Sequence, residues 1–327
     1  MIAPRSERGT ALLTVLLLVA VIATISATAL DRIGIATRLS GNIATVAQAR
    51  AWLATAELLA ATRIEDLRGS DEDQTTLAGN WMGVERSIEL PGGGFVRARV
   101  TDGANCFNLN SLVSERADGT LVAREEGGRQ FAALMITLGI GAGEAAQIAD
   151  SATDYIDSDQ VALRLGGEDS AYTGQGGALP ANQLMADPSE LRGVARVGAR
   201  DYRLLQRWLC ALPVTTMSPL NVNTLLPEQA PLLAMLAPGM IDLSLARARL
   251  ASRPAAGYGS VLKFWTTPPF EGLQVPAEAT RQVQVRTDFF TLQAIVEAGS
   301  VRVSETALFD ASEPPARIVR RQWGEAN

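Results

Sequence analysis

The sequence contains no histidine and a single lysine, Lys263. Without histidine, the chain has no Ser-His-Asp or Cys-His nucleophile, no histidine-ligated zinc and no ordinary proton shuttle near neutral pH. The residues around Lys263 do not resemble an activated amine nucleophile. These absences argue against an enzyme.

Basic residues are also too few for a typical nucleic-acid-binding protein. The 29 Lys and Arg residues are outnumbered by 35 Asp and Glu residues, which gives a formal net charge of −6. Proteins that bind the phosphate backbone normally carry a basic excess. The short basic run at Arg317, Arg320 and Arg321 is typical of a solvated edge. We therefore predict no nucleic-acid partner.

Cysteine is limited to Cys106 and Cys210, which are too far apart in the sequence to resemble a metal-ligand pair. In a chain that leaves the cytoplasm, an even count favours one disulfide. A bridge that closes so long a loop stabilises a protein by roughly 2–4 kcal/mol. Two separate buried thiols are the alternative interpretation.

Charge is absent from Thr10 to Leu30, after a polar start (residues 1–9) that contains Arg5 and Arg8. At about 1.5 Å per residue, an apolar helix of this length spans a hydrocarbon core of about 30 Å. The arginines on its N-terminal side predict a cytoplasmic N-terminus and a periplasmic remainder.

Two kinds of processing fit this N-terminus. A secretory signal peptide has the same basic start and apolar core, and Ala27-Thr28-Ala29 offers a cleavage site that would leave Leu30 first. However, the helical pattern continues well beyond that site, without proline and with many alanines. This continuity predicts one helix from Thr10 to Leu67.

Residues 8–18, RGTALLTVLLL, resemble the prepilin-peptidase site of type IV pilins and type II pseudopilins. The resemblance implies cleavage after Gly9 and methylation of Thr10. Most members have glutamate at the fifth mature position, whereas this chain has Thr14 there. In its lack of this carboxylate and in its size, the chain resembles the minor pseudopilins of the GspK family. Because that glutamate would pair with a neighbour's N-terminal amine in lipid, its absence suits a subunit at the tip.

The remainder predicts strands at both ends and helices between them. Alternating residues flank glycines in 83–101 and in 289–308, which indicates two hairpins, and residues 315–323 fit another strand. Helical patterns occupy the middle. The fold class is therefore α+β, with a pilin-like long N-terminal helix packed on an antiparallel β-sheet and a large inserted α-helical domain. The GspK resemblance implies the same plan over nearly the whole chain. The helical ranges are 129–138, 144–155, 188–192, 199–212, 227–237 and 241–252.

The expected domains follow this plan. They are a leader (1–9), the transmembrane part of the helix (10–30), a periplasmic helix with the first part of the β-domain (31–111), the inserted α-helical domain (112–219), and a second helical, SAM-like unit with the remainder of the β-domain (220–327).

A short motif occurs twice, as FNLNSL at 107–112 and LNVNTL at 220–225. Its Asn and Ser or Thr residues are typical of caps at the starts of helices. The resemblance to GspK implies that the two copies flank the insertion. Cys106 and Cys210 lie just before the two copies, so a disulfide between them would fix the base of the insertion. Residues 220–253 also resemble a helix-hairpin-helix module. The acidic chain and the scarcity of nearby cations favour a structural role for it over DNA binding.

Five carboxylates flank a glycine-containing loop at 154–172. Oxygen donors at this density suit Ca²⁺, although Val161 stands where an EF-hand would have a ligand. A solvated acidic loop is the alternative. The GspK resemblance implies a structural Ca²⁺ held by Asp157, Asp159, Glu168 and Asp169, with Asp154 as a helix-end cap.

The resemblance implies an assembly protein of the inner membrane with one transmembrane segment. It would initiate or cap the type II secretion pseudopilus for export of folded periplasmic proteins. The implied partners are the minor pseudopilins GspI, GspJ and GspH, the major pseudopilin and prepilin peptidase. The alternatives are a minor pilin of a type IV pilus and a periplasmic binding protein that begins at Leu30.

Overall fold

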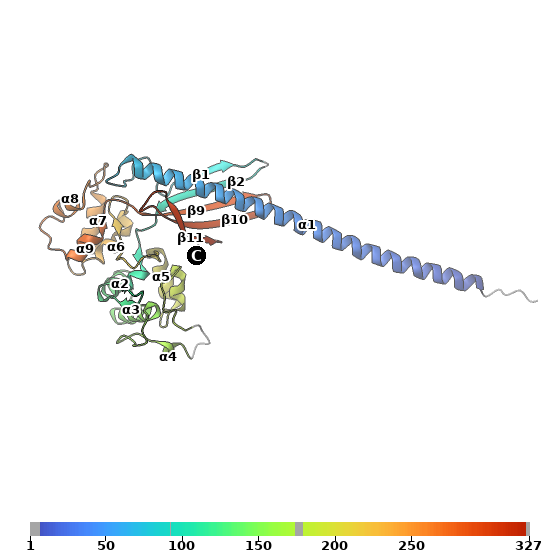
Figure 1. Cartoon of the computed structure of the whole chain (residues 1–327), viewed down its shortest axis with the longest axis horizontal. Coiled ribbons are helices and arrows are strands. Elements are labelled where there is room, and N and C mark those ends of the chain that lie inside the picture. Colours follow the sequence, from blue (N-terminus) through green and yellow to red (C-terminus); the bar gives the residue numbers. More distant parts are fainter. Residues whose placement is uncertain (1–6, 92, 174–178, 325–327) are drawn as a thin grey trace, which may run out of the picture.

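The computed structural model describes residues 7–91, 93–173 and 179–324. One long helix, α1 (Glu7–Ser70), leads into the rest of the chain, and its N-terminal half projects away from the head (Figure 1). The helix expected from Thr10 to Leu67 therefore forms, with a few more residues at each end. Alanines and straight-chain residues without an internal proline sustain this length.

The second half of α1 packs on one face of an antiparallel sheet with the order β1-β2-β9-β10-β11. The expected hairpins are both present, as is the last strand. Gly94, in the first turn, has φ +101°, and a Cβ there would lie 2.2 Å from the Glu297 carbonyl oxygen, so the close approach requires glycine. The strands are β1 (Arg86–Glu89), β2 (Phe95–Asp102), β9 (Phe289–Ala298), β10 (Val301–Asp310) and β11 (Arg317–Trp323).

Burial alternates along β9, as expected when one face of a strand covers a helix. Leu292, Ala294 and Val296 on β9 are buried against Leu53 and Ile64 of α1. Within the same layer, Glu57 of α1 and Glu305 of β10 are also buried. The Arg321 guanidinium binds both carboxylate oxygens of Glu57, at 2.6 and 2.8 Å.

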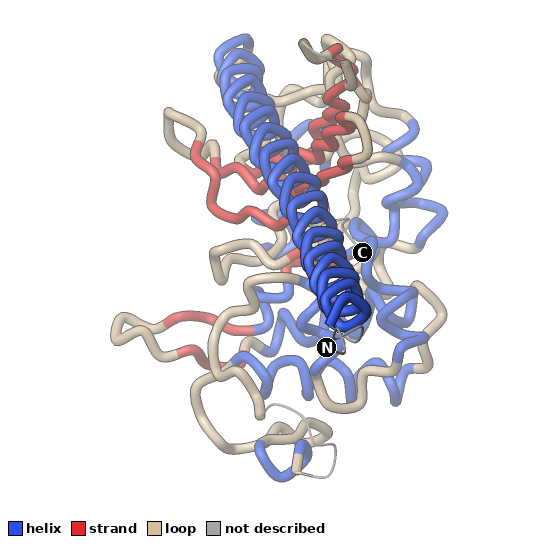
Figure 2. The backbone as a smooth tube through the Cα atoms, turned by 90° about the vertical axis from the view of Figure 1, so that its right-hand side faces the viewer, coloured by secondary structure: helices blue, strands red, loops and turns tan. Residues whose placement is uncertain are grey.

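The helical part of the head is one insertion between two neighbouring strands. Strand β2 ends at Asp102 and pairs directly with β9, which starts at Phe289, so residues 103–288 form a single excursion from the sheet. The insertion expected at 112–219 is thus the first part of a longer one that also contains the second helical unit. The helices of both units gather beside the sheet, at the end of α1 opposite its projecting half (Figures 1 and 2). The two units share one hydrophobic core.

Short elements make up this inserted segment. Its helices are α2 (Glu125–Thr137), α3 (Ala142–Ile156), α4 (Asp169–Tyr172), α5 (Ala199–Leu205), α6 (Ala230–Ala234), α7 (Leu243–Ala251), α8 (Val261–Thr266) and α9 (Ala277–Gln282). Its strand pairs are β3 (Phe107–Asn108) with β6 (Leu209–Cys210), β4 (Val113–Glu115) with β5 (Leu121–Ala123), and β7 (Leu220–Asn221) with β8 (Val283–Gln284).

The helix expected over 199–212 is wrong in its second half. Helix α5 ends at Leu205, a short 3-10 turn follows, and Leu209 and Cys210 pair with β3. Tertiary pairing at this position overrides the local helical pattern.

Candidate functional site

The first candidate site is the exposed half of α1. Every residue from Thr10 to Ala44 is exposed, including many large aliphatic side chains, whereas Ala49 and Leu53 are buried against the sheet. Within the described residues, one helix is long and apolar enough to cross a membrane, and it is this one. The hydroxyl of Thr14 donates to the Ala11 carbonyl oxygen at 2.9 Å, so its polar group is satisfied within the helix. The junction between Gly9 and Thr10 lies at the start of α1.

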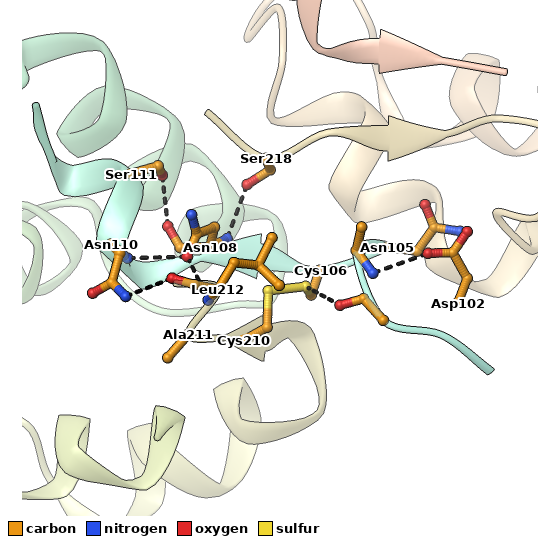
Figure 3. The surroundings of a disulfide bond; sticks show 12 residues. Asp102, Asn105, Cys106, Asn108, Asn110, Ser111, Cys210, Ala211, Leu212 and Ser218 are labelled. Atoms are coloured by element: carbon orange, nitrogen blue, oxygen red, sulfur yellow. Dashed lines mark hydrogen bonds between the residues drawn. A yellow bond between two sulfur atoms is a disulfide. The ribbon is translucent and has the colours of Figure 1, made fainter. Parts of the chain in front are cut away.

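The second candidate site is the base of the insertion, where Cys106 and Cys210 form a disulfide (Figure 3). The sulfur atoms are 1.95 Å apart and the Cα atoms 5.8 Å apart. Beside the bridge, Asn108 is fully buried, and its carboxamide donates to the carbonyl oxygens of Val214 and Thr216 at 2.9 and 3.1 Å. Its oxygen accepts from the Leu212 N–H at 3.0 Å. The side chain therefore fastens the segment after Cys210 to β3.

Asn110 extends the same junction. Its carboxamide nitrogen donates to the carbonyl oxygens of Met185 and Leu212 at 2.9 and 2.8 Å, and its oxygen accepts from the Met185 N–H at 2.8 Å. The helix-cap interpretation holds for Asn108, which also accepts from the Asn110 N–H at the start of a 3-10 turn. Asn108 and Asn110 make more hydrogen bonds to distant segments than within the turn. The sequence analysis did not predict these long-range bonds.

The second copy of the motif fastens the insertion to the sheet. Asn221 donates to the Thr75 carbonyl oxygen and to the Thr287 hydroxyl, at 3.0 and 2.8 Å. Hydroxyls of Thr224 and Thr287 donate to the carboxylate of Asp102 at the end of β2. Burial raises the pKa of Asp102, and these hydroxyl bonds partly offset that rise.

The third candidate site is the acidic cluster, which we define as Asp157, Asp159 and Glu168. One carboxylate oxygen from each lies within 4.8 Å of the others. Asp157 and Glu168 are buried, and Oδ1 of Asp157 and both carboxylate oxygens of Glu168 have no hydrogen-bond partner among the residues that the structure describes. Burial, followed by the neighbouring carboxylates, raises the pKa of each of these two groups to about 7. Such a donor set suits a hard divalent cation.

Asp154 holds this loop in place from within α3. Its carboxylate accepts from the Leu163 N–H at 3.1 Å and from the Gly167 N–H at 2.8 Å, so it is not a helix-end cap. A Cβ on Gly166 would lie 2.0 Å from the Asp154 carboxylate, which explains the glycine. The structure also shows a contact that sequence reasoning missed, between the Asp150 carboxylate and the Leu165 N–H at 3.0 Å.

Asp169 does not join the acidic cluster. It is the first residue of α4, directly after Glu168, and its charge is among the causes that raise the pKa of Glu168. Of the four expected ligands, the structure therefore brings three together.

Two arginines of the helix-hairpin-helix segment, Arg249 and Arg253, point into the protein, whereas Arg247 is exposed. The guanidinium of Arg249 is buried between Tyr258 and Phe264 and donates to the Phe264 carbonyl oxygen at 2.7 Å. Arg253 donates to the Leu225 carbonyl oxygen at 2.6 Å. These two cations organise neighbouring loops and are not presented to a polyanion.

Comparisons with known proteins agree with this architecture. Models of type II secretion system protein K match residues 105–214 and 220–286. The chain is 33% identical to type II secretion system protein K of Klebsiella pneumoniae, over 97% of both chains. The chain belongs to the type II secretion system protein K (GspK) family. It is also 31% identical to protein K of Pectobacterium carotovorum subsp. carotovorum, over 97% of each chain.

A solved structure shares the GspK fold. The match is to a chain of the crystal structure of the GspK–GspI–GspJ complex from the type 2 secretion system of enterotoxigenic Escherichia coli, with a TM-score of 0.74 and 30% identity. It covers 85% of this chain and 96% of that chain. The family and the α+β fold class expected from the sequence are confirmed.

Proposed function

We propose that this GspK protein is a non-catalytic minor pseudopilin that initiates or caps the type II secretion pseudopilus at its tip. The observation that carries the proposal is the exposed, apolar half of α1, which has no carboxylate from Thr10 to Leu30 and is continuous with the helix under the head. A subunit with Thr14 in place of the usual glutamate lacks the group that would pair with a neighbour's N-terminal amine below it. The broad head beside α1 also favours a position with no subunit above it.

The proposed topology has α1 in the inner membrane, a cytoplasmic N-terminus and a periplasmic head. Prepilin peptidase would cut after Gly9, and Thr10 would be methylated. The exposed face of α1 would then pack against the equivalent helices of GspI and GspJ, and also against GspH and the major pseudopilin. The solved relative supports the first two partners, since it belongs to a complex of GspK with GspI and GspJ.

Mass spectrometry of the mature N-terminus tests this proposal. A methylated Thr10 is expected, and a start at Leu30 would show a cleaved signal peptide and overturn it. The type IV pilus alternative is tested separately by co-purification of the full-length chain with GspI and GspJ from the same cells. Recovery with type IV pilins and without GspI or GspJ would contradict the type II assignment.

We also propose that the acidic cluster binds a structural Ca²⁺. The support is the combination of three buried carboxylate oxygens of Asp157 and Glu168, which have no partner in the described part of the chain, with the exposed carboxylate of Asp159, because a buried charge needs a compensating charge. Asp157, Asp159 and Glu168 would hold the ion, with Asp169 adding negative charge nearby. A bound Ca²⁺ would neutralise the repulsion between these carboxylates and clamp the loop after α3.

Thermal unfolding of the full chain in detergent, with Ca²⁺ or with a chelator, tests this site. At a free Ca²⁺ concentration of a hundred times Kd, binding adds about 2.7 kcal/mol to the free energy of unfolding. A double variant, Asp157→Asn with Glu168→Gln, should lose this gain. It should also be more stable than wild type without Ca²⁺, because the repulsion is removed. Glu144→Gln, at an exposed position of α3, is the control, and a wild type indifferent to Ca²⁺ would refute the site.

A further inference from the structure

A cleft of about 540 Å³ lies beside the β7–β8 pair, where the two segments matched by the family models meet. Its walls include Arg124, just before α2, and Thr216, Met217 and Pro219, which lead into β7. Ligand sites of proteins are typically about 300–1,000 Å³ and are frequent at junctions between packed units. The size and place of this cleft therefore suit a ligand.

One wall of the cleft is a row of polar side chains on an extended segment. Neighbouring side chains of an extended chain point to opposite faces. Here the intervening residues Val283 and Thr287 are buried, and the alternate residues line the cleft. These alternate residues are Gln284, Arg286 and Asp288, and Gln282, the last residue of α9, precedes them at the cleft.

Two guanidinium groups in the cleft lack a carboxylate partner among the described residues. Arg124 donates to the Thr215 carbonyl oxygen at 2.7 Å, and no ion pair joins Arg286 to a described carboxylate. The carboxylate of Asp288 is already paired with Arg68 at 2.7 Å. The cleft therefore retains positive charge that a ligand with spaced negative groups would neutralise.

Gln282 borders the cleft with an unsatisfied carboxamide. The residue is only 4% exposed, yet neither Nε2 nor Oε1 has a hydrogen-bond partner within the described ranges. The buried Nε of Arg286 likewise has no partner in those ranges. A buried polar group without a partner is costly. A carboxamide offers a donor and an acceptor together, which is the complement of a peptide group.

We propose that this cleft binds an extended acidic segment of a partner protein. Carboxylates of the segment would pair with Arg286 and Arg124, and a small rotation of the Gln282 side chain would bring its amide to the segment's backbone. The carboxylates of Asp288 and Glu278 at the cleft are paired with Arg68 and Arg281, so Arg286 and Arg124 remain for the segment. Carboxylates spaced along a chain can pair with both.

The test measures the fluorescence anisotropy of a short labelled peptide of alternating glycine and aspartate, added to the full chain in detergent micelles. Its twin has asparagine in place of aspartate. We expect the acidic peptide to bind about tenfold more tightly than the twin, and Arg286→Gln to remove most of that difference. Arg200→Gln, which removes an exposed arginine of α5, should leave binding unchanged.

A second variant separates recognition from folding. Gln282→Met keeps the side-chain length and should weaken both peptides by a similar factor, because backbone pairing does not depend on peptide charge. Equal binding of the two peptides, or equal competition by inorganic phosphate at matched concentration, would overturn the proposal. The proposal would also be overturned if Arg286→Gln and Gln282→Met lowered the melting temperature but left peptide binding unchanged. Because the measurement needs no pseudopilus, its outcome is independent of the tip assignment.

Discussion

The two halves of the head are stabilised in different ways. The sheet under α1 is built from long backbone ladders and an aliphatic layer, whereas the inserted segment 103–288 consists of short elements joined by particular side chains. The side chains of Asn108, in β3, and Asn110, just after it, bind chain segments that lie more than seventy positions away. The sheet half should therefore tolerate most single polar substitutions, and the insertion should not. Three predictions test this difference.

The largest effect is expected from Asn108→Ala. The substitution leaves the Leu212 N–H and the carbonyl oxygens of Val214 and Thr216 without their buried partner. Each such loss costs about 1–3 kcal/mol, so the total should exceed about 3 kcal/mol. Chemical denaturation of the full chain in detergent measures it, with Asn42→Ala on the exposed part of α1 as the control. A loss equal to that of the control would remove the contrast between the halves.

An intermediate effect is expected from opening the disulfide. A Cys106→Ser, Cys210→Ser variant should lose about 2–4 kcal/mol, because the bridge restricts the unfolded chain. Hydrogen exchange should rise first around β3 and β6 while β9 and β10 stay protected. If both halves lose protection together, the head is one cooperative unit and the comparison fails.

The smallest effect is a pH dependence of the sheet half. Burial, and then the neighbouring Glu57, raises the pKa of Glu305 to about 8 from its ordinary value of 4.5. Between these values the folded state holds a proton that the unfolded state releases, so the free energy of unfolding falls as the pH rises from about 5 to 8. The pKa of Glu57 is lowered through its bonds to Arg321, against the effect of burial, and this carboxylate acts in the opposite sense at pH values below 4.5.

Melting temperatures measured across that range check the prediction. Glu305→Gln should flatten the slope by several degrees, since a neutral amide has no proton to lose. Glu313→Gln, at an exposed position after β10, controls for the loss of one charge. A Glu305→Gln protein with the wild-type slope would assign the pH dependence to other groups.

The same contrast explains what could be predicted from the sequence. Both long hairpins and the extent of α1 follow from local patterns, because alternation, glycine turns and the absence of proline act over a few neighbouring residues. The limits of α5 did not follow, since Leu209 and Cys210 pair with β3 across the chain. The roles of Asn110 and Asn221 were hidden for the same reason: their partners are distant in sequence.

The acidic loop falls between these cases. The expected ligand set came from the GspK resemblance. Its carboxylates at Asp157, Asp159 and Glu168 converge, whereas Asp169 lies outside the acidic cluster. The role of Asp154 depends on how the chain folds back over α3, and composition does not encode that path. The Gly166 position was a usable signal, because a side chain there would meet the Asp154 carboxylate.

The direct pairing of β2 with β9 has a consequence for the order of folding. These neighbouring strands are separated in the chain by the whole segment 103–288, so their alignment requires the closure of a very long loop. An insertion that has already folded holds its two ends together and removes most of that entropic barrier. We expect newly synthesised molecules to fold the helical segment first and to pair β2 with β9 afterwards. Substitutions that slow the folding of the helical segment would then leave β2 and β9 as unpaired edge strands, which are prone to aggregate.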